Sequence, residues 1–406
     1  MGLTACTGTA GRVNVLHGGL ATTLDRGFTA LRERHQVPGL AAGILLDGRL
    51  AWANGYGFAD IENRRPMTAD TVQNVGSVTK TLTATLALQD IEAGRLDLDG
   101  DINRYLRFAV RNPDHPKVPI TLRHLLTHRS SIRDGVAYSH SYRCGDQTLS
   151  LEDWLEAYFD PSAKPNHFHV WAPGTPNPPI APRGYSNIAF GLIGLLSERV
   201  GGKPYALLCR ERIFGPLGMT SSGIRLDEID RRREAVPYKA LSADFTPADT
   251  SEPEKALARY SEGNFAPHAG RHFAFCRYSF ATAPDGLLRT SVTDLARFIS
   301  AWTDHGAVAG RATTRLLSAD TVAMALGVNS DERTLGWNSV RRHFGDDTPI
   351  SGSALFGHNG SDPGIGAVVV FCPENRGGFV MMCNTFYNDA IADDGLGLYL
   401  SVISSR

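Results

Sequence analysis

Ser77-Val78-Thr79-Lys80, directly after Gly76, opens a stretch of strongly helical sequence. In a helix, side chains three residues apart lie one turn apart on the same face, so the Lys80 amine can approach the Ser77 hydroxyl. A serine is a weak nucleophile at neutral pH and needs an adjacent base. A lysine is such a base only where burial or neighbouring cations favour its neutral form. Because short motifs also arise by chance in polar helix starts, the pair gains weight only from further motifs.

Two further motifs follow along the chain. Tyr185-Ser186-Asn187 lies between a proline-rich stretch, residues 173–182, and an apolar helical stretch, residues 188–200. His358-Asn359-Gly360 precedes a run of β-forming residues at 365–372. Each motif also has an ordinary structural explanation. A tyrosine can be a buried aromatic with a satisfied hydroxyl, an asparagine a helix N-cap, and a histidine a core residue bonded to backbone.

With the three motifs together, the chain resembles the serine β-lactamase and penicillin-binding protein superfamily, in which an S-x-x-K serine is followed by two such elements. The resemblance is strongest to the branch of class C β-lactamase-related esterases and DD-peptidases. There Y-x-N takes the middle position and H-x-G often replaces K-T-G. Stretches that look like landmarks of this branch extend the resemblance from about residue 20 to residue 400: residues 120–128, 214–219, 284–288 and 293–298.

The resemblance implies a catalytic role for three side chains. Ser77 would attack an acyl carbon and form a covalent ester, and Lys80 would accept the serine proton. Tyr185 would relay a proton to the leaving group, for which a phenol needs a nearby positive charge. The backbone N–H groups of Ser77 and Ser361 would form the oxyanion hole, where one donor typically lowers the barrier by about 3 kcal/mol.

The same resemblance implies substrate-binding residues in the second and third motifs: Asn187, His358, Asn359 and Gly360. Asn187 would hold Lys80 and a polar edge of the substrate by hydrogen bonds. His358 would orient Tyr185 or the substrate, and Gly360 would let the substrate backbone come close. Elsewhere in the chain, no pair of acidic residues stands out as suited to acid–base catalysis.

Two departures from the pattern of this branch bear on function. The chain reads Thr127-His128-Arg129-Ser130-Ser131 where the branch usually has T-H-T-S-G, so this loop is bulkier and less flexible. His358 stands where true β-lactamases keep a lysine that attracts the substrate carboxylate. A neutral imidazole binds a carboxylate less well, which argues against penicillins as the natural substrate.

These features predict a serine hydrolase that acts on a small ester or amide through a covalent acyl-enzyme, and His358 favours an esterase. Three alternatives remain open: an acyltransferase that passes the acyl group to an amine or alcohol, a peptidase acting near a D-residue as DD-peptidases do, and a penicillin-binding sensor that acylates without turnover. Residues 241–283 are expected to wall the cleft. Arg271 and Arg277 in this stretch suggest a polar or anionic substrate group.

Both ends of the chain predict strands, and the middle predicts helices. Residues 40–46 and 50–56 flank Asp47-Gly48, a pair that suits the type I′ turn of a hairpin. The helix at Ser77 is expected to carry Leu82, Leu86 and Ile91 on an apolar face and to end near Gly94. Further strands are expected at residues 334–341, 365–372 and 379–384, and further helices at 20–35, 122–127, 151–158, 188–200, 205–213 and 293–302.

This pattern and the resemblance predict an α+β fold of the β-lactamase/transpeptidase type. An antiparallel sheet built from both chain ends would be flanked by helices, with a mainly helical region inserted. We expect a discontinuous sheet domain at residues 15–105 and 290–406, and a mainly helical domain with long cleft-lining loops at residues 106–289. The active site would lie at their junction, because ligand sites favour domain interfaces.

Composition limits the classes of partner. A chain of 406 residues with 42% hydrophobic content can bury a large core. The formal net charge of −1 gives no electrostatic reason to expect nucleic acid or an anionic membrane as a partner. No apolar run reaches the roughly 18 residues of a transmembrane helix. The expected partner is a small-molecule ester, amide or peptide substrate, and the oligomeric state is left open.

The six cysteines are widely scattered, with no C-x-x-C pair, and predict neither a zinc site nor a disulfide framework. Three in apolar stretches are expected in the core: Cys209, Cys372 and Cys383. Cys144 and Cys276 lie in loop-like sequence and could pair if the protein is exported. Leu3-Thr4-Ala5-Cys6 resembles the end of a lipoprotein signal, but the segment that should precede it is missing. The sequence as written therefore predicts a cytoplasmic protein.

Two histidine pairs look superficially like metal ligands: His167 with His169, and His268 with His272. Both fall in loop-like sequence without a third ligand in a known pattern. The sequence therefore predicts no metal and no cofactor.

Overall fold

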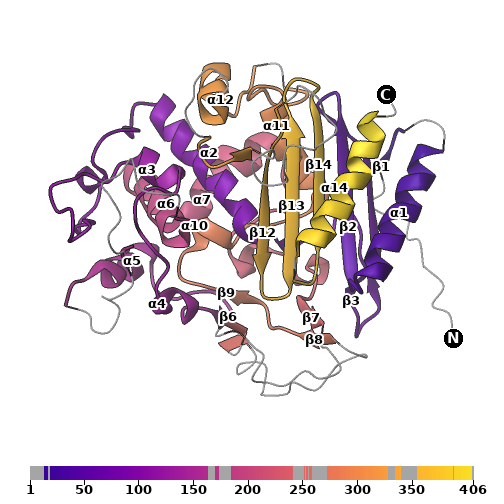
Figure 1. Cartoon of the computed structure of the whole chain (residues 1–406), viewed down its shortest axis with the longest axis horizontal. Coiled ribbons are helices and arrows are strands. Elements are labelled where there is room, and N and C mark those ends of the chain that lie inside the picture. Colours follow the sequence, from indigo (N-terminus) through magenta and orange to yellow (C-terminus); the bar gives the residue numbers. More distant parts are fainter. Residues whose placement is uncertain are drawn as a thin grey trace.

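A central antiparallel sheet is built from strands near both ends of the chain (Figure 1). The computed structural model describes residues 13–16, 19–162, 170–172, 184–240, 251, 253–254, 256–257, 272–311, 313–327, 334–339, 354–386 and 388–404. Within these residues the sheet has eight strands. Seven follow one another in the order β1 (Val13–Asn14), β3 (Arg49–Asp60), β2 (Gly39–Leu46), β14 (Gly377–Cys383), β13 (Ile365–Cys372), β12 (Phe356–Asp362) and β11 (Asn338–Ser339); the eighth, β4 (Arg65–Pro66), pairs with β3.

The early and late parts of the chain meet where β2 pairs with β14, from Leu45 opposite Gly378 to Leu40 opposite Cys383. Strands β2, β13 and β14 are buried along their whole length. Because successive side chains of a strand point to opposite faces, each strand supplies two cores. On β2, Leu45 joins one core and Leu40 the other. The sheet therefore separates two apolar layers.

The turn between β2 and β3 has the predicted form. Asp47 and Gly48 have φ angles of 53° and 73°. Positive φ at both central residues is the mark of a type I′ turn, whose twist matches that of the strands it joins. The predicted hairpin is therefore confirmed.

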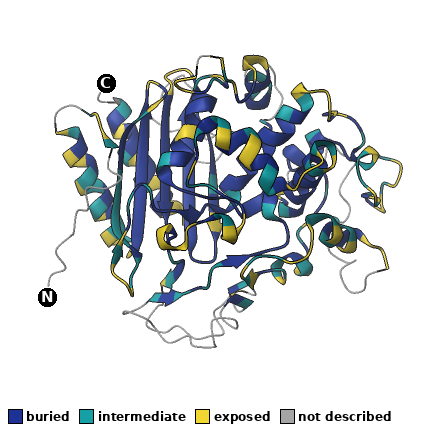
Figure 2. Ribbon diagram, turned by 180° about the vertical axis from the view of Figure 1, so that it is seen from behind, coloured by how far each residue is buried: buried dark blue, intermediate teal, exposed yellow. Residues whose placement is uncertain are grey.

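Helices cover both faces of the sheet. On one face lie α1 (Leu20–Arg34) and α14 (Asp389–Ser404), which pack on each other in Figure 1. Phe28 of α1 stacks on Trp52 of β3, with ring centroids 5.3 Å apart. On the other face, α11 (Val292–Thr303) packs against β14, β3 and β2. Figure 2 shows the result as a buried sheet between helices whose outer sides are exposed.

Helix α2 (Thr79–Glu92) is buried more completely than the sequence predicts. Every residue from Thr79 to Leu88 is buried, because α6 and α10 also pack against the helix. The apolar residues expected on one face, Leu82 and Leu86, are buried, and the polar positions around them are buried as well. Its threonines tolerate burial because their hydroxyls bond to backbone carbonyls: Thr81 donates to Val78 and Thr85 donates to Thr81. The helix ends as predicted, with Gly94 at a φ of 67°.

The middle of the chain is mainly helical, as predicted. Its helices are α3 (Leu122–Leu126), α4 (Val136–Ser139), α5 (Leu151–Phe159), α6 (Asn187–Gly201), α7 (Tyr205–Cys209), a π-helical turn (Arg210–Phe214), α8 (Gly215–Leu217) and α10 (Ala283–Gly286), and α12 (Ala319–Leu326) follows α11. Three short two-stranded pairs accompany these helices. One joins β5 (Gln73–Asn74), from the early part of the chain, to β10 (Arg289–Thr290). The other two lie within the middle of the chain: β6 (Arg143–Cys144) with β9 (Tyr278–Ser279), and β7 (Tyr238–Ala240) with β8 (His272–Ala274).

A disulfide joins Cys144, on β6, to Cys276, two residues before β9, with Cα atoms 5.7 Å apart. The pairing that the sequence left open is therefore made, and it closes a loop of 132 residues. The three cysteines expected in the core are buried and free: Cys209, Cys372 and Cys383. Cys6 lies outside the described residues.

One expectation about the late strands needs correction. The strand expected at residues 334–341 is limited, within the described residues, to Asn338–Ser339, and residues 340–341 lie outside them. His358-Asn359-Gly360 precedes β13 as expected, and it also forms the middle of β12, a strand that the sequence did not predict. In the part of the chain that the structure describes, no helix is both long enough and apolar enough to span a bilayer.

Candidate active site

Ser77 lies in a single 3₁₀ turn, Gly76–Val78, that leads directly into α2. The chain is tight here because Gly76 has a φ of 51° and donates its N–H to Asn74 Oδ1 at 2.7 Å. A Cβ at Gly76 would lie 3.0 Å from the backbone nitrogen of Ser361 on β12. The left-handed conformation and this close approach both call for glycine, so Gly76 holds the Ser77 turn against β12.

Lys80 lies one turn further along and is fully buried. Its Nζ is 3.0 Å from Ser77 Oγ, 2.7 Å from Asn187 Oδ1 and 2.7 Å from the carbonyl oxygen of Asp285. Because a buried charge or amine is costly without partners, these three contacts define where the amine can lie. The structure thus brings together the serine, the lysine and the asparagine of the first two motifs.

The Asn187 side chain is held in one orientation by Asp134, a residue that the sequence did not single out. Asn187 Nδ2 donates to Asp134 Oδ2 at 2.9 Å, so the amide oxygen must face Lys80. Asp134 also accepts from the backbone N–H groups of Asn187 and Ile188, at 2.8 and 3.1 Å. Asp134 therefore caps α6 and orients Asn187 through the same carboxylate.

The stretch that departs from the T-H-T-S-G pattern packs against the second motif. His128 Nδ1 lies 3.2 Å from the backbone nitrogen of Ser186, and its ring centroid is 4.4 Å from that of Tyr185. Ser131 has a φ of 61°, in the left-handed region where the usual glycine is favoured. The substituted segment thus keeps its backbone course and supports Tyr185-Ser186-Asn187.

Tyr185 contacts Lys80 through the face of its aromatic ring and not through its hydroxyl group. Lys80 Nζ is 5.0 Å from the ring centroid, and 5.7 Å from that of Phe190. The side chain of Tyr185 is 45% exposed, and its hydroxyl forms no hydrogen bond with any residue that the structure describes. The hydroxyl is thus available to a molecule in the site.

The third motif lies on β12 directly against the Ser77 turn. A Cβ at Gly360 would lie 1.9 Å from the Val75 carbonyl oxygen and 2.9 Å from the backbone nitrogen of Ser77. His358 and Gly360 are two residues apart on one strand and therefore share its face. His358 is buried, with Nδ1 2.6 Å from the carbonyl oxygen of Asn359, while Ser361 is exposed.

Two buried carboxyl groups lie near Lys80, although no acid pair stood out in the sequence. Tyr138 donates its hydroxyl to Asp285 Oδ2 at 2.7 Å, and Tyr142 donates to Asp362 Oδ1 at 2.5 Å. Burial raises the pKa of Asp285 to about 7, against the opposing effect of the Lys80 charge. Burial likewise raises the pKa of Asp362 to about 7, opposed by the Tyr142 hydrogen bond and by Lys80.

These acids make stability depend on pH in a definite direction. Because their pKa in the folded protein lies near 7, well above the roughly 3.9 of an unfolded aspartate, the native state binds more protons between these values. The free energy of unfolding should therefore fall as pH rises from about 4 through 7. In urea unfolding at pH 5 and pH 8, Asp285→Asn should lose less stability between the two pH values than wild type.

Asp230→Asn is the matched control for this experiment. Hydrogen bonds from Arg232 lower the pKa of Asp230 to about 2, so its titration lies outside the pH 5–8 window. The variant should show the same difference in stability between pH 5 and pH 8 as wild type. If Asp285→Asn also kept the full wild-type difference, Asp285 would be ionised across the whole window and its raised pKa would be refuted.

Arg277 does not serve the cleft as the sequence suggested. Its guanidinium pairs with Glu234, which also binds the fully buried Arg289 at 3.1 Å. Arg277 also donates to the carbonyl oxygen of Leu226. These contacts make it part of a buried ion network that holds β10 and the neighbouring loops. Arg271 lies outside the described residues.

Among the histidines considered as metal ligands, only His272 lies in the described part of the chain, where its Nε2 is 3.3 Å from the Gln36 carbonyl oxygen. No group of three or more His, Cys, Asp or Glu side chains that could hold a metal ion occurs among the described residues.

Removal of the Asp134 carboxylate tests its dual role. Asp134→Ala should lower the free energy of unfolding by about 1–2 kcal/mol, because α6 loses a cap. It should also slow acylation of Ser77 roughly tenfold or more, because Asn187 loses its anchor and no longer fixes Lys80. Urea unfolding and the burst of product release measure the two effects.

Ser318→Ala provides the comparison, because Ser318 Oγ caps a different helix, α12, by accepting from Thr321 N at 3.1 Å. It should lose stability without a matching loss in acylation rate. Equal loss of rate in both variants would mean that loss of stability alone slows acylation and that Asp134 has no separate effect on Lys80.

Comparison with known proteins places the chain in a family. The sequence profile of the family described as Beta-lactamase matches residues 24–401, nearly the whole chain. The chain belongs to the beta-lactamase family. Members of this family are serine hydrolases, and the relatives of this chain include an esterase and D-aminopeptidases.

Two relatives illustrate this range. Esterase EstB of Burkholderia gladioli is 33% identical over 233 residues, which cover 54% of this chain and 55% of the esterase. A D-aminopeptidase of Cereibacter sphaeroides (strain ATCC 17029) is 31% identical over 229 residues, covering 56% of this chain and 41% of that protein. Each match covers little more than half of this chain. It spans about half of the esterase and less than half of the D-aminopeptidase.

A solved structure confirms the predicted fold. The D-amino acid amidase of Ochrobactrum anthropi, complexed with D-phenylalanine, superposes with a TM-score of 0.70 at 21% identity, covering 94% of this chain and 100% of the amidase. The expected β-lactamase/transpeptidase-like α+β fold is thus correct. At this identity the likeness concerns the fold alone.

Proposed function

We propose that the protein is a serine hydrolase that cleaves a small ester or amide through an acyl-enzyme at Ser77. The observation that carries this proposal is the position of Lys80 Nζ, 3.0 Å from Ser77 Oγ. A serine with a base at this distance is the minimum arrangement for nucleophilic catalysis. The beta-lactamase family, to which the chain belongs, provides the reaction class.

The contacts of Lys80 hold its amine against Ser77. Nζ donates to Asn187 Oδ1 and to the Asp285 carbonyl oxygen at 2.7 Å, and to Ser77 Oγ at 3.0 Å, a set of three acceptors that suits an ammonium. After loss of one proton, the first two acceptors would keep the remaining N–H groups. The lone pair would then face the Ser77 hydroxyl, which could donate its proton to it. Asp134 strengthens this arrangement because it prevents the Asn187 amide from turning its NH₂ group to Lys80.

The remaining roles follow from the same arrangement. Ser77 Oγ attacks the acyl carbon while its proton moves to Lys80 Nζ, and the charge on the carbonyl oxygen is stabilised by the backbone N–H groups of Ser77 and Ser361. The bond to the leaving group then breaks, and the leaving group receives a proton through the Tyr185 hydroxyl. Water next attacks the Ser77 ester, releases the acid and restores the serine. His358 and Asn359 border the substrate along β12.

Esterase activity is the first choice for the substrate class, because His358 replaces the cationic lysine that binds the carboxylate of penicillins. The similarity to EstB over about half of the chain agrees with this choice. A D-residue amidase or peptidase is the second candidate. Besides the D-aminopeptidase relative, the Cys144–Cys276 disulfide favours it, because disulfides persist outside the reducing cytoplasm, where D-residue peptides of cell walls occur.

Turnover of three substrates separates these possibilities: p-nitrophenyl butyrate, D-phenylalanine p-nitroanilide and nitrocefin. We expect the butyrate ester to be cleaved fastest and nitrocefin slowest, and Ser77→Ala to abolish all turnover. Intact mass during the reaction should show a transient increase equal to the acyl group on wild type only. Unchanged ester turnover in Ser77→Ala would refute the proposed nucleophile.

The other outcomes identify the alternatives. Faster cleavage of the D-residue anilide than of the ester would show that the protein is an amidase or peptidase acting on D-residues. Faster release of nitrophenol on addition of an amine or alcohol, with formation of the new amide or ester, would assign an acyltransferase. A stable adduct without turnover would assign a sensor.

A further inference from the structure

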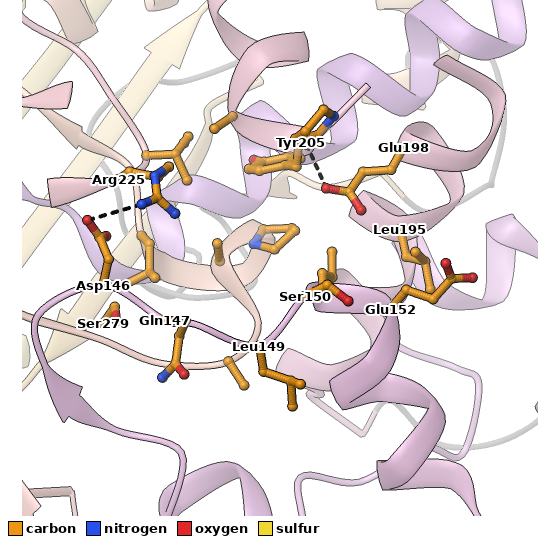
Figure 3. A pocket seen from close by; sticks show the side chains of 18 of the residues that line it. Asp146, Gln147, Leu149, Ser150, Glu152, Leu195, Glu198, Tyr205, Arg225 and Ser279 are labelled. Atoms are coloured by element: carbon orange, nitrogen blue, oxygen red, sulfur yellow. Dashed lines mark hydrogen bonds and ion pairs between the residues drawn. The ribbon is translucent and has the colours of Figure 1, made fainter. Parts of the chain in front are cut away.

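A second cavity lies apart from the Ser77 site, at the other end of α6 (Figure 3). Its volume is about 530 Å³, within the roughly 300–1,000 Å³ of small-molecule sites. Leu195 and Glu198 from the second half of α6, Tyr205 of α7 and Pro284 of α10 contribute to its lining, together with the segment 146–152 before and within α5. The motif residues that surround Lys80 do not line it.

The lining of this cavity is largely apolar. In Figure 3, Leu149, Leu195 and the ring of Tyr205 surround the central space. Ile224, Phe280 and Leu287 add to the apolar lining. A hydrocarbon chain or ring placed here would be removed from water, at a gain of about 25 cal/mol per Å² of its buried apolar surface.

The charged groups of the lining differ in whether they have a partner. Each cation already pairs with a carboxylate: Arg199 with Glu152 at 3.5 Å, Lys203 with Glu211 at 2.6 Å and Arg225 with Asp227 at 3.0 Å. Glu198 is the exception among the acids. It accepts from the backbone N–H of Tyr205 at 2.6 Å, and no cation of the described residues lies within ion-pair distance of it.

The position of Glu198 leaves a half-buried carboxylate without a counter-ion among the described residues. Burial, with a smaller contribution from the neighbouring Glu152, raises its pKa to about 7, while the hydrogen bond from the Tyr205 backbone opposes this rise. One oxygen of Glu152, Oε1, is also buried without a hydrogen-bond partner. Because a charge is stabilised by an opposite charge at close range, a cation beside Glu198 would supply its missing counter-ion. A cation that carries N–H donors could also bond to Glu152 Oε1, whose carboxylate already pairs with Arg199.

We propose that this cavity is a binding site for a small hydrophobic primary amine. Its ammonium group binds Glu198, with Glu152 nearby, and its hydrocarbon part packs on Leu195, Phe280 and Pro284. A primary ammonium has three donors and therefore suits a carboxylate with free acceptor sites. The apolar part of the lining favours a cation that carries a hydrocarbon group over a bare inorganic cation, which offers no apolar surface to bury.

The cavity shares a wall with the catalytic site. Pro284 lines the cavity, while the carbonyl oxygen of the next residue, Asp285, binds Lys80. Tyr205 also lines the cavity and is hydrogen-bonded at 2.7 Å to Thr83, whose hydroxyl in turn donates to the Pro284 carbonyl oxygen at 2.6 Å. An occupant of the cavity therefore contacts the same short helix, α10, that positions the catalytic lysine.

Isothermal titration calorimetry with n-hexylamine at pH 8 tests the proposal on the whole chain, with no ester present. Wild type and Ser77→Ala should bind one equivalent with the same Kd, because the cavity does not include Ser77. Glu198→Gln should bind at least tenfold more weakly, since the amide keeps the shape and the acceptor for Tyr205 N but lacks the charge. Neutral n-hexanol and anionic n-hexanoate should bind wild type at least tenfold more weakly than the amine.

Two further variants make the result specific. Glu33→Gln removes an exposed carboxylate on α1 and should bind like wild type. Ala206→Phe adds a ring to the cavity lining and should lose binding while remaining folded by circular dichroism. Equal binding by Glu198→Gln and wild type, equal binding of hexanol and hexylamine, or no binding of hexylamine to wild type would each overturn the proposal.

Discussion

Lys80→Ala should acylate about 10²–10⁴-fold more slowly than wild type, the range associated with loss of a general base. Lys80 Nζ lies 3.0 Å from Ser77 Oγ, and no other amine or imidazole of the described residues contacts this hydroxyl. Without the amine, the serine proton has no acceptor when Oγ attacks. The measurement is the rate of p-nitrophenol release in the first turnover, together with the mass of the acylated protein.

Two comparison variants separate chemistry from folding. Lys80→Met keeps most of the buried hydrocarbon volume and should be as slow as Lys80→Ala, whereas Lys80→Ala also leaves a cavity that lowers stability. Lys203→Ala, at an exposed lysine paired with Glu211, should acylate at the wild-type rate. If Lys80→Met acylated at near wild-type rate while folded, the base would have to be another group.

Gly360→Ala should lower kcat about 10²–10³-fold, as expected for loss of an oxyanion-hole donor. The new Cβ would lie 1.9 Å from the Val75 carbonyl oxygen, far closer than atoms can approach, and 2.9 Å from Ser77 N. Since both neighbours are backbone atoms, β12 and the Ser77 turn must move apart, which separates the N–H groups of Ser77 and Ser361. Overpacking of this kind also costs about 1–3 kcal/mol of stability. Steady-state kinetics and urea unfolding check both effects.

Gly397→Ala is the control for the same substitution elsewhere. Gly397 lies on α14, and a Cβ there meets no atom within 4 Å. Because alanine favours a helix over glycine by about 1 kcal/mol, this variant should be slightly more stable than wild type with unchanged kcat. A normal kcat in Gly360→Ala would show that the two N–H groups do not form the oxyanion hole.

Much of the fold was predictable because its signals are local. The Asp47-Gly48 turn, the apolar strands at residues 365–372 and the helix that ends near Gly94 each depend on residues close together in the sequence. The burial of every residue of α2 from Thr79 to Leu88 was not predictable from the period of the helix, because α6 and α10 supply the covering surfaces. The strand at His358-Asn359-Gly360 was missed, since its small and polar residues carry no alternating apolar pattern.

In the proposed site, too, contacts between residues close in the sequence were predictable and contacts between distant residues were not. Ser77 and Lys80 are three residues apart, so helical geometry alone predicts their contact, which the structure contains. Asp134 lies 53 residues from Asn187, and no spacing rule connects them. The buried acids are more remote still, because Asp362 and its partner Tyr142 are 220 residues apart. Only the folded chain brings such side chains together.

The pairing of β2 with β14 has a consequence for biosynthesis. Strand β2 is apolar along its whole length, yet the strand that covers one of its edges is completed only at Cys383, more than 300 residues later. At about 5–20 residues per second, a ribosome needs roughly 15–60 s to make that stretch. During this interval the nascent chain carries an open apolar edge, a template for association with other chains. A ribosome-bound chaperone that shields this edge should therefore raise the yield of folded protein, and chains stalled before β14 should aggregate.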